Sequence, residues 1–196
     1  MKKVLLSLTA LFAFGLANAQ ETTTGGFAQG DAFISGAVGF GTESTGDVKE
    51  NVFTVSPRAA YFLTDNISLG VALGYTSIKD EAPLTEDVTT SVFEAGVFGR
   101  YYFMPSSQFS VFGQLGVGYQ TLKQEQGDAE AKTNGFNVGL APGISYFVSE
   151  HFALEATFGI LGYNTVKPDA DGAESTDTFE FGLNMNDINF GIVYKF

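Results

Sequence analysis

The chain has 196 residues, with ten Lys and Arg against 22 Asp and Glu, and a formal net charge of −12. This charge argues against nucleic acid as a partner, because neutralising phosphates requires a basic surface. The 24 Gly and 20 Phe indicate β structure, and a chain without Cys cannot use disulfides or thiol acylation. The length fits one domain.

Residues 1–19 have the three parts of a secretory signal peptide. Lys2 and Lys3 carry the positive charge, an apolar run follows, and Ala17 and Ala19 form the A-x-A cleavage site. The apolar run is shorter than the roughly 20 residues that a spanning helix needs. We therefore expect cleavage and a mature chain that begins at Gln20.

The mature chain divides into a polar stretch, residues 20–29, which we expect to be flexible, and a β domain, residues 30–196. Within the β domain, apolar residues alternate with small and polar ones, which is typical of strands with two different faces. Eight segments follow this pattern, around residues 34–40, 53–63, 67–76, 93–103, 109–120, 136–146, 152–160 and 188–196. Their phase requires a bulge near Gly159 and another between Met185 and Ile188.

The charges distinguish a membrane barrel from a soluble sandwich. In all eight segments, every Asp, Glu, Lys and Arg falls on the mixed face, and the other face is wholly apolar with aromatic ends. The mixed face is rich in Gly, Ser and Asn, which suits a narrow barrel interior, whereas the apolar face suits contact with lipid. A soluble β-sandwich would place its dense apolar set inside and its polar residues outside.

The connections between the segments alternate in length. Residues 64–66, 104–108 and 148–151 form short connections, and residues 42–50, 79–89, 123–133 and 164–177 form long polar ones. Short periplasmic turns and long extracellular loops are typical of outer-membrane barrels, and this pattern places both termini in the periplasm. Adjacent aromatics beside the short turns, such as Tyr61 and Phe62, predict an aromatic girdle at the membrane interface.

The C-terminal strand carries a resemblance to a known family. Phe196, preceded at alternate positions by Tyr194, Ile192 and Phe190, resembles the terminal signal that the barrel assembly machinery reads. Together with the eight segments, it resembles the small outer-membrane barrels typified by OmpX and the membrane domain of OmpA, also described as the porin family. The resemblance implies an all-β, eight-stranded antiparallel up-and-down transmembrane β-barrel in the outer membrane of a Gram-negative cell envelope.

We expect a monomer that contacts outer-membrane lipid and lipopolysaccharide. Such families share a scaffold and differ in function. We expect a structural or surface-interaction role, with acidic loops available to an extracellular ligand. A narrow channel for ions or small solutes is the alternative, whereas an interior just wide enough for side chains disfavours a wide pore.

Catalytic and metal-binding patterns are weak in this sequence. The single histidine, His151, falls in a short turn, and there is no Cys or second His for a transition metal. The acidic run at residues 169–177 lacks the full ligand spacing of a calcium loop. We therefore expect no cofactor, no metal and no enzymatic activity, and an outer-membrane enzyme is the third and weakest interpretation.

Four charged residues fall on the inward face, namely Arg58, Glu94, Arg100 and Glu155. Buried charges are tolerated when they are paired and hydrogen-bonded. The sequence therefore predicts an ion-pair network that plugs the lumen, and separate charges solvated by lumen water are the alternative.

Overall fold

The computed structural model describes residues 25–83, 86–182 and 188–196, so the expected signal peptide and its cleavage site lie outside the described residues. The described residues form ten β-strands: β1 (Ala32–Thr45), β2 (Val48–Phe62), β3 (Ile67–Glu81), β4 (Val88–Tyr102), β5 (Phe109–Gln126), β6 (Ala129–Phe147), β7 (Phe152–Phe158), β8 (Leu161–Pro168), β9 (Thr176–Phe181) and β10 (Ile188–Lys195). No helix among them is long and apolar enough to cross a membrane.

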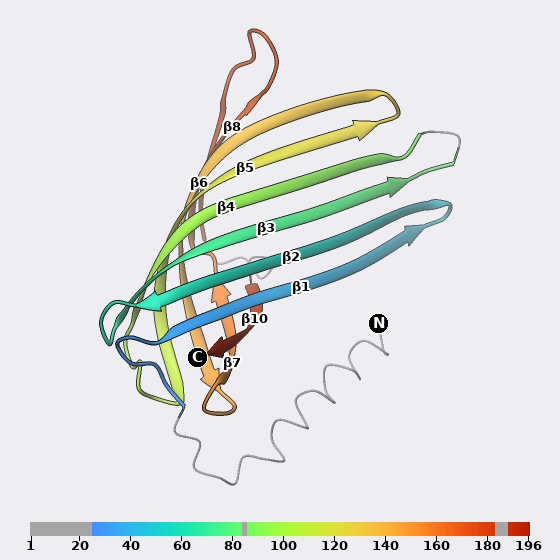
Figure 1. Ribbon diagram of the computed structural model, residues 1–196. Helices are drawn as coiled ribbons and strands as arrows, with labels where there is room; N and C mark the ends of the chain where they lie inside the picture. Colours follow the sequence, from blue (N-terminus) through green and yellow to red (C-terminus); the bar gives the residue numbers. More distant parts are fainter. Residues whose placement is uncertain (1–24, 84–85, 183–187) are drawn as a thin grey trace.

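These ten segments build an antiparallel barrel of eight strands (Figure 1). β1 to β6 pair in chain order, and β6 pairs with both β7 and β8, which together form the seventh barrel strand. β9 pairs with β8 and β10 pairs with β7, so these two form the eighth. β10 then pairs with β1 and closes the barrel. The predicted fold class is confirmed.

The seventh barrel strand contains the expected bulge near Gly159. Thr157 is opposite Gly143 of β6, whereas Leu161 is opposite Leu140. The strand therefore advances one residue more than its partner between these pairs, which is the definition of a β-bulge. The extra residue keeps Tyr163 on the outward face. The second expected bulge falls on residues 183–187, which lie outside the described residues.

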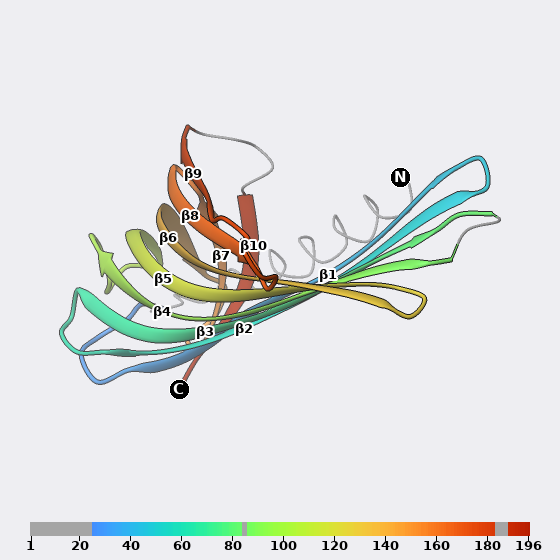
Figure 2. The ribbon, with the colours of Figure 1, turned by 90° about the horizontal axis from the view of Figure 1, so that it is seen from above.

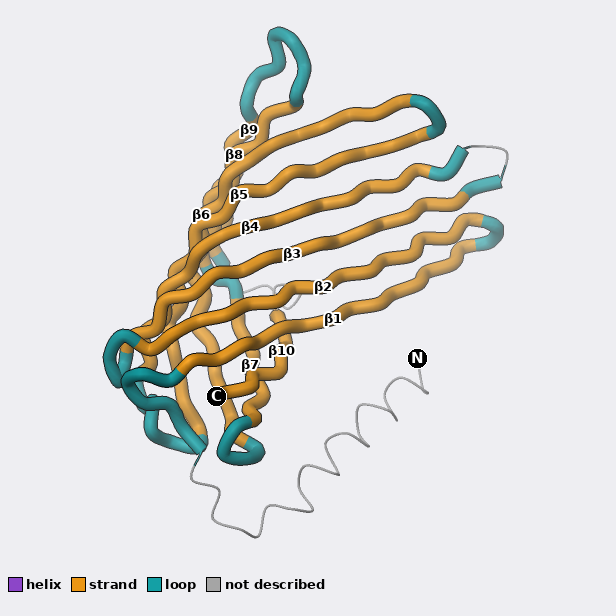
Figure 3. The backbone as a smooth tube through the Cα atoms, viewed as in Figure 1, coloured by secondary structure: helices purple, strands orange, loops and turns teal. Residues whose placement is uncertain are grey.

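The connections gather at two ends of the barrel, as the tube in Figure 3 shows. At one end, short turns join β2 to β3, β4 to β5 and β6 to β7. At the other end, the hairpins β1–β2, β3–β4 and β5–β6 project together (Figures 1 and 2). Phe196 N donates to Ala32 O at 3.0 Å, so the chain also ends where β1 begins, at the short-turn end.

Two of the predicted long loops are wrong in detail. Residues 42–50 and 123–133 are mostly strand, because β1 and β2 continue to a turn at Gly46 and Asp47, and β5 and β6 to one at Gly127 and Asp128. Gly46 has φ +62 and Gly127 has φ +54, the left-handed conformation that two-residue hairpin turns require. The projecting parts are therefore paired β-ribbons.

The aromatic pairs beside the short turns divide between two faces. Tyr61, Tyr101 and Tyr146 point outward and are 42–49% exposed, as an interfacial girdle requires. Their neighbours Phe62, Tyr102 and Phe147 point inward and are fully buried. The predicted girdle therefore accounts for half of these aromatics, because successive strand residues face opposite sides. The inward half fills the lumen.

Candidate functional site

The lumen is filled with aromatic rings at the short-turn end. We call this layer the aromatic plug; it consists of Phe27, Phe33, Phe62, Tyr102, Phe112 and Phe147, each at most 1% exposed. Phe27 lies at its centre, with its ring centroid 4.7 Å from that of Phe62, 4.9 Å from that of Phe147 and 5.1 Å from that of Tyr102. Tilted and offset rings at these distances pack favourably, so the plug closes this end of the barrel.

Phe27 comes from the segment that precedes β1, and several polar contacts hold this segment under the barrel. Phe27 N donates to Pro105 O at 2.7 Å, and Lys195 Nζ donates to Gly26 O at 2.7 Å. At Gly25 an added Cβ would lie 2.3 Å from Phe147 Cβ, so the close approach requires glycine. The described part of residues 20–29 is thus packed, although the sequence predicts a flexible stretch. The sequence signal for this packing is Phe27 itself, a large apolar residue in an otherwise polar segment.

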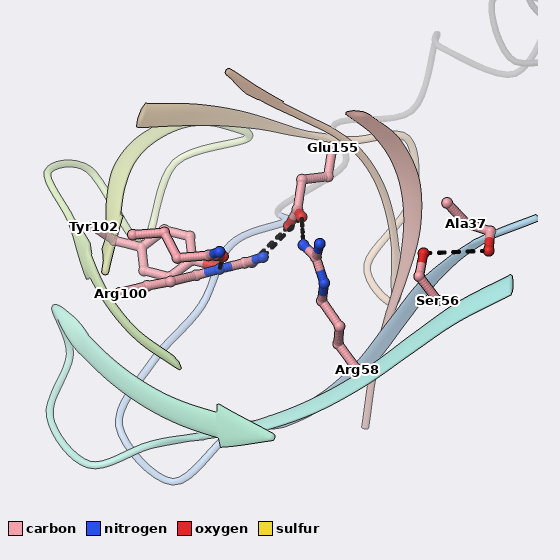
Figure 4. A network of polar contacts seen from close by, with 7 residues as sticks. Ala37, Ser56, Arg58, Arg100, Tyr102 and Glu155 are labelled. Carbon is pink, nitrogen blue, oxygen red and sulfur yellow. Dashed lines mark hydrogen bonds and ion pairs between the residues drawn. The ribbon is translucent and has the colours of Figure 1, made fainter. Parts of the chain in front are cut away.

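A charged pair lies on the lumen side of the aromatic plug. Arg100 Nη1 and Nη2 donate to Glu155 Oε2 and Oε1 at 2.6 and 2.8 Å, and the two side chains are 0% and 5% exposed (Figure 4). Arg100 Nε also donates to Gln114 Oε1 at 2.8 Å, and Nη1 to Tyr102 Oη at 3.1 Å. Burial of both charges is tolerated because the pair is bidentate and further hydrogen-bonded.

The guanidinium of Arg100 also lies against the aromatic rings. Its Cζ is 4.4 Å from the ring centroid of Phe112 and 5.0 Å from that of Phe98. A cation over an aromatic face is attracted by the ring quadrupole, more strongly where water is excluded. The ion pair and the aromatic plug therefore form one packed unit.

The other two predicted network residues are placed differently. Arg58 Nη1 lies 4.0 Å from Glu155 Oε1, and the Arg58 side chain is 24% exposed. Glu94 is exposed, and no ion pair within the described part of the chain includes it. The structure thus brings Arg58, Arg100 and Glu155 together, while Glu94 lies farther from the short-turn end, on the same strand as Arg100.

Above this unit the lumen widens into a cavity with a volume of ≈ 270 Å³. Small and polar side chains line it, among them Ser56, Arg58, Gly74, Glu94, Gly96, Gln114, Gly116 and Asn137. The lumen is therefore a cup, closed at the short-turn end.

The projecting hairpins carry their own ion pairs. Lys79 Nζ lies 2.8 Å from Glu81 Oε1 and 2.9 Å from Asp87 Oδ2, and these hydrogen bonds raise the pKa of Lys79. Lys132 and Lys123 lower the pKa of Glu130 by donating to its carboxylate. No group of three or more His, Cys, Asp and Glu among the described residues could hold a metal ion.

His151 has a structural environment at the short-turn end. Its Nδ1 is 2.9 Å from Lys195 O, and its ring stacks on Tyr194 with centroids 5.9 Å apart. Both contacts tie the β6–β7 turn to β10.

A model of the outer membrane protein beta-barrel domain matches residues 6–196. This chain belongs to that family. Membership places it in the outer membrane. In such barrels, short turns are typical of the periplasmic end and longer connections of the extracellular end. No curated protein matches the chain.

Two solved structures illustrate the shared fold. Neisserial surface protein A (NspA) is 20% identical with a TM-score of 0.53, and the match covers 86% of this chain and 99% of that one. The outer membrane protein OprG from Pseudomonas aeruginosa is 18% identical with a TM-score of 0.52, and the match covers 87% and 98%. At such identities the likeness shows the fold alone.

The four residues of the predicted assembly signal lie at the end of β10. Phe190, Ile192 and Phe196 are 72%, 58% and 64% exposed, and Tyr194 packs on Phe152 and Phe196 with ring centroids 5.0 and 5.1 Å apart. All four face the lipid side of the barrel. Recognition of this strand by the barrel assembly machinery stays a prediction.

Proposed function

We propose that this barrel acts as a structural and surface-interaction protein. It presents acidic β-ribbons outside the cell, and its lumen is closed to solutes. The observation that carries the proposal is the packed short-turn end, where Phe27 and the Arg100–Glu155 pair fill the lumen. A channel requires a continuous aqueous path, and an eight-stranded barrel has little room beside its own side chains. No enzymatic role is proposed.

The length of the strands supports a role outside the membrane. A spanning β-strand needs about 9–11 residues, whereas β5 has 18 and β6 has 19. The excess lies at the hairpin end, since the other end is bounded by the short turns. Paired ribbons of this kind present side chains at fixed positions, so little conformational entropy is lost when a partner binds.

The charge of the ribbons indicates the kind of partner. At residues 43–50, 79–87, 123–132 and 167–180, Asp and Glu outnumber Lys three to one. Such a surface favours association with a basic partner and steers it at low ionic strength. The partner class that we propose is therefore a protein or peptide with a basic face.

The closed lumen is tested by conductance. Purified protein in planar lipid bilayers should show no steady single-channel current, whereas a variant that breaks the Arg100–Glu155 pair, Glu155→Gln, should show small currents. Steady conductance of the unmodified protein would overturn the closed lumen and make the narrow channel the better interpretation.

The surface role is tested on the β5–β6 hairpin. Deleting residues 123–126 and 129–132 removes paired residues only, so the register of β5 and β6 and the Gly127–Asp128 turn are kept. The deleted residues carry two Lys and two Glu, so the deletion leaves the net charge unchanged and serves as the control. Protein in nanodiscs of neutral lipid should keep its salt-sensitive binding to poly-lysine when this deletion is made. The full-length variant Glu125→Gln, Asp128→Asn, Glu130→Gln removes three negative charges and should bind poly-lysine more weakly. Unchanged binding by this variant would contradict a role for the acidic ribbons.

A further inference from the structure

The cup above the aromatic plug contains a guanidinium whose hydrogen-bonding capacity is unused. Arg100 occupies both carboxylate oxygens of Glu155 at 2.6 and 2.8 Å, and Arg58 reaches the nearer oxygen only at 4.0 Å. Among the described residues, Arg58 has no hydrogen-bond partner. Two guanidinium groups therefore share one carboxylate, and Arg58 lines the cavity with none of its five N–H donors hydrogen-bonded within the described part of the chain.

A carboxylate without an ion pair in the described part of the chain lines the same cavity. Glu94 lies over Gly74, where an added Cβ would be 3.0 Å from Glu94 Oε2. Gly74 is opposite Glu94 in the β3–β4 register, and Ala72, two residues along, is opposite Arg58 in the β2–β3 register. The acid is therefore displaced toward the open end, on β4, which is separated from the β2 strand of Arg58 by β3.

We propose that the cup binds a small amphoteric solute, a molecule with one carboxylate and one ammonium group, from the extracellular side. The carboxylate accepts hydrogen bonds from Arg58, and the ammonium group faces Glu94. A guanidinium binds a carboxylate through two parallel hydrogen bonds, which fixes the orientation of the solute. The inference rests on the proposed function, because a closed floor makes the cavity a binding site with one entrance.

The pair of opposite charges selects against simpler ions. A solute with only a carboxylate gains the contact with Arg58 but is repelled by Glu94. A solute with only an ammonium group is attracted by Glu94 but repelled by Arg58. Specificity of this kind comes from the unfavourable contact as much as from the favourable one. The volume of ≈ 270 Å³ lies below the range of pockets for drug-sized ligands, so the solute is small.

The experiment uses purified protein in detergent micelles and ligand-observed saturation-transfer NMR, with L-alanine, acetate and ethylammonium as probes. Alanine should bind about tenfold more tightly than either single-charge probe. Arg58→Gln and Glu94→Gln should each weaken alanine binding about tenfold. Arg58→Lys keeps the positive charge but loses the planar guanidinium group, so its affinity for alanine should lie between those of the unmodified protein and Arg58→Gln. The control Glu180→Gln removes a β9 carboxylate outside the cavity and should leave binding unchanged.

A second signature concerns selectivity. Glu94→Gln removes the repulsion, so acetate should bind this variant more tightly than it binds the unmodified protein. Absence of alanine binding, or alanine binding that survives Arg58→Gln in a variant with an unchanged melting temperature, would overturn the site. Equal affinity for alanine and acetate would overturn the amphoteric class. Bilayer conductance is measured separately from alanine binding. A conducting barrel would contradict the proposed function, whereas the binding measurements alone decide whether the site exists.

Discussion

Arg100 and Glu155 lie 55 residues apart in the sequence, yet their side chains form two hydrogen bonds across the lumen, at 2.6 and 2.8 Å. Their strands, β4 and β7, are separated by β5 and β6 in the barrel. The pair therefore links two parts of the barrel wall that share no backbone hydrogen bonds.

Replacing Glu155 by Gln should destabilise the barrel strongly. The change leaves the buried Arg100 guanidinium without a counter-charge, and breaking a buried ion pair in this way costs about 3–5 kcal/mol. The melting temperature in detergent should fall accordingly. Glu94→Gln is the matched control. Because Glu94 is exposed, its replacement should change the melting temperature little. Equal melting temperatures for the two variants would contradict a structural role for the pair.

The alternation in the sequence predicted which residues face the lumen and which face lipid, because side chains on a strand alternate strictly between two faces. It therefore placed Arg58, Arg100 and Glu155 inside. It did not predict that Arg100 takes both oxygens of Glu155, because that depends on rotamers and on the Gln114 and Tyr102 contacts.

The aromatic plug was harder to predict than the charges. The alternation assigns Phe62 and Tyr102 to the mixed face. Because their neighbours Tyr61 and Tyr101 lie on the apolar face, a girdle at the membrane interface already explained the aromatic cluster. Phe27 has no strand alternation to assign it a face, and its position depends on the tertiary contacts of the segment before β1. The hairpin ends were read as loops because polar residues on both faces hide the alternation outside the membrane.

A charge on the lipid face should hinder insertion. Leu115 and Val71 are 55% and 56% exposed on the outward face. Arg at either position costs about 2–4 kcal/mol if the site lies at the bilayer midplane. Insertion into lipid vesicles, followed by the heat-dependent shift in gel mobility, measures the effect. Gln124→Arg in the projecting part of β5 is the control, and normal insertion of both lipid-face variants would show that the outward face is wrongly assigned.

Deleting Phe196 should impair assembly more than stability. Phe196 is 64% exposed and packs on Tyr194, so its loss removes little buried area, whereas the family resemblance assigns it to the assembly signal. The amount of protein in the outer-membrane fraction should fall, while the melting temperature of refolded protein stays close to that of the full chain. Normal accumulation in the outer membrane would remove the basis for this role.

The β5–β6 hairpin should weaken in acid. Lys132 and Lys123 hold the pKa of Glu130 below its ordinary value, so the folded hairpin favours the charged form. The stabilisation is present above the ordinary pKa and is lost as the pH falls through the lowered one. A ¹³C NMR titration of the Glu130 carboxyl should show the low midpoint, and Lys132→Met should raise it. A midpoint at or above the ordinary value would contradict the ion pairs.

Phe27→Ala should remove the centre of the aromatic plug without preventing barrel formation. Phe27 lies outside the strands, so no strand pairing depends on its side chain. Truncation of a fully buried Phe costs about 3–5 kcal/mol, because the surrounding rings of Phe62, Tyr102 and Phe147 lose their contacts and cannot fill the space. Circular dichroism should report an unchanged strand content, and the melting temperature should fall.

The same variant separates the two layers that close the lumen. Phe40→Ala, at a lipid-facing position that is 78% exposed, is the matched control and should change neither the melting temperature nor the conductance. If the Arg100–Glu155 pair alone blocks ions, Phe27→Ala will stay non-conducting, and Glu155→Gln will conduct as well as its combination with Phe27→Ala. We expect instead a small ion conductance from Phe27→Ala itself. The Phe27 ring packs on Tyr102, whose hydroxyl accepts a hydrogen bond from Arg100. A melting temperature equal to that of the unmodified protein would show that the Phe27 ring contributes nothing to the stability of the closed end.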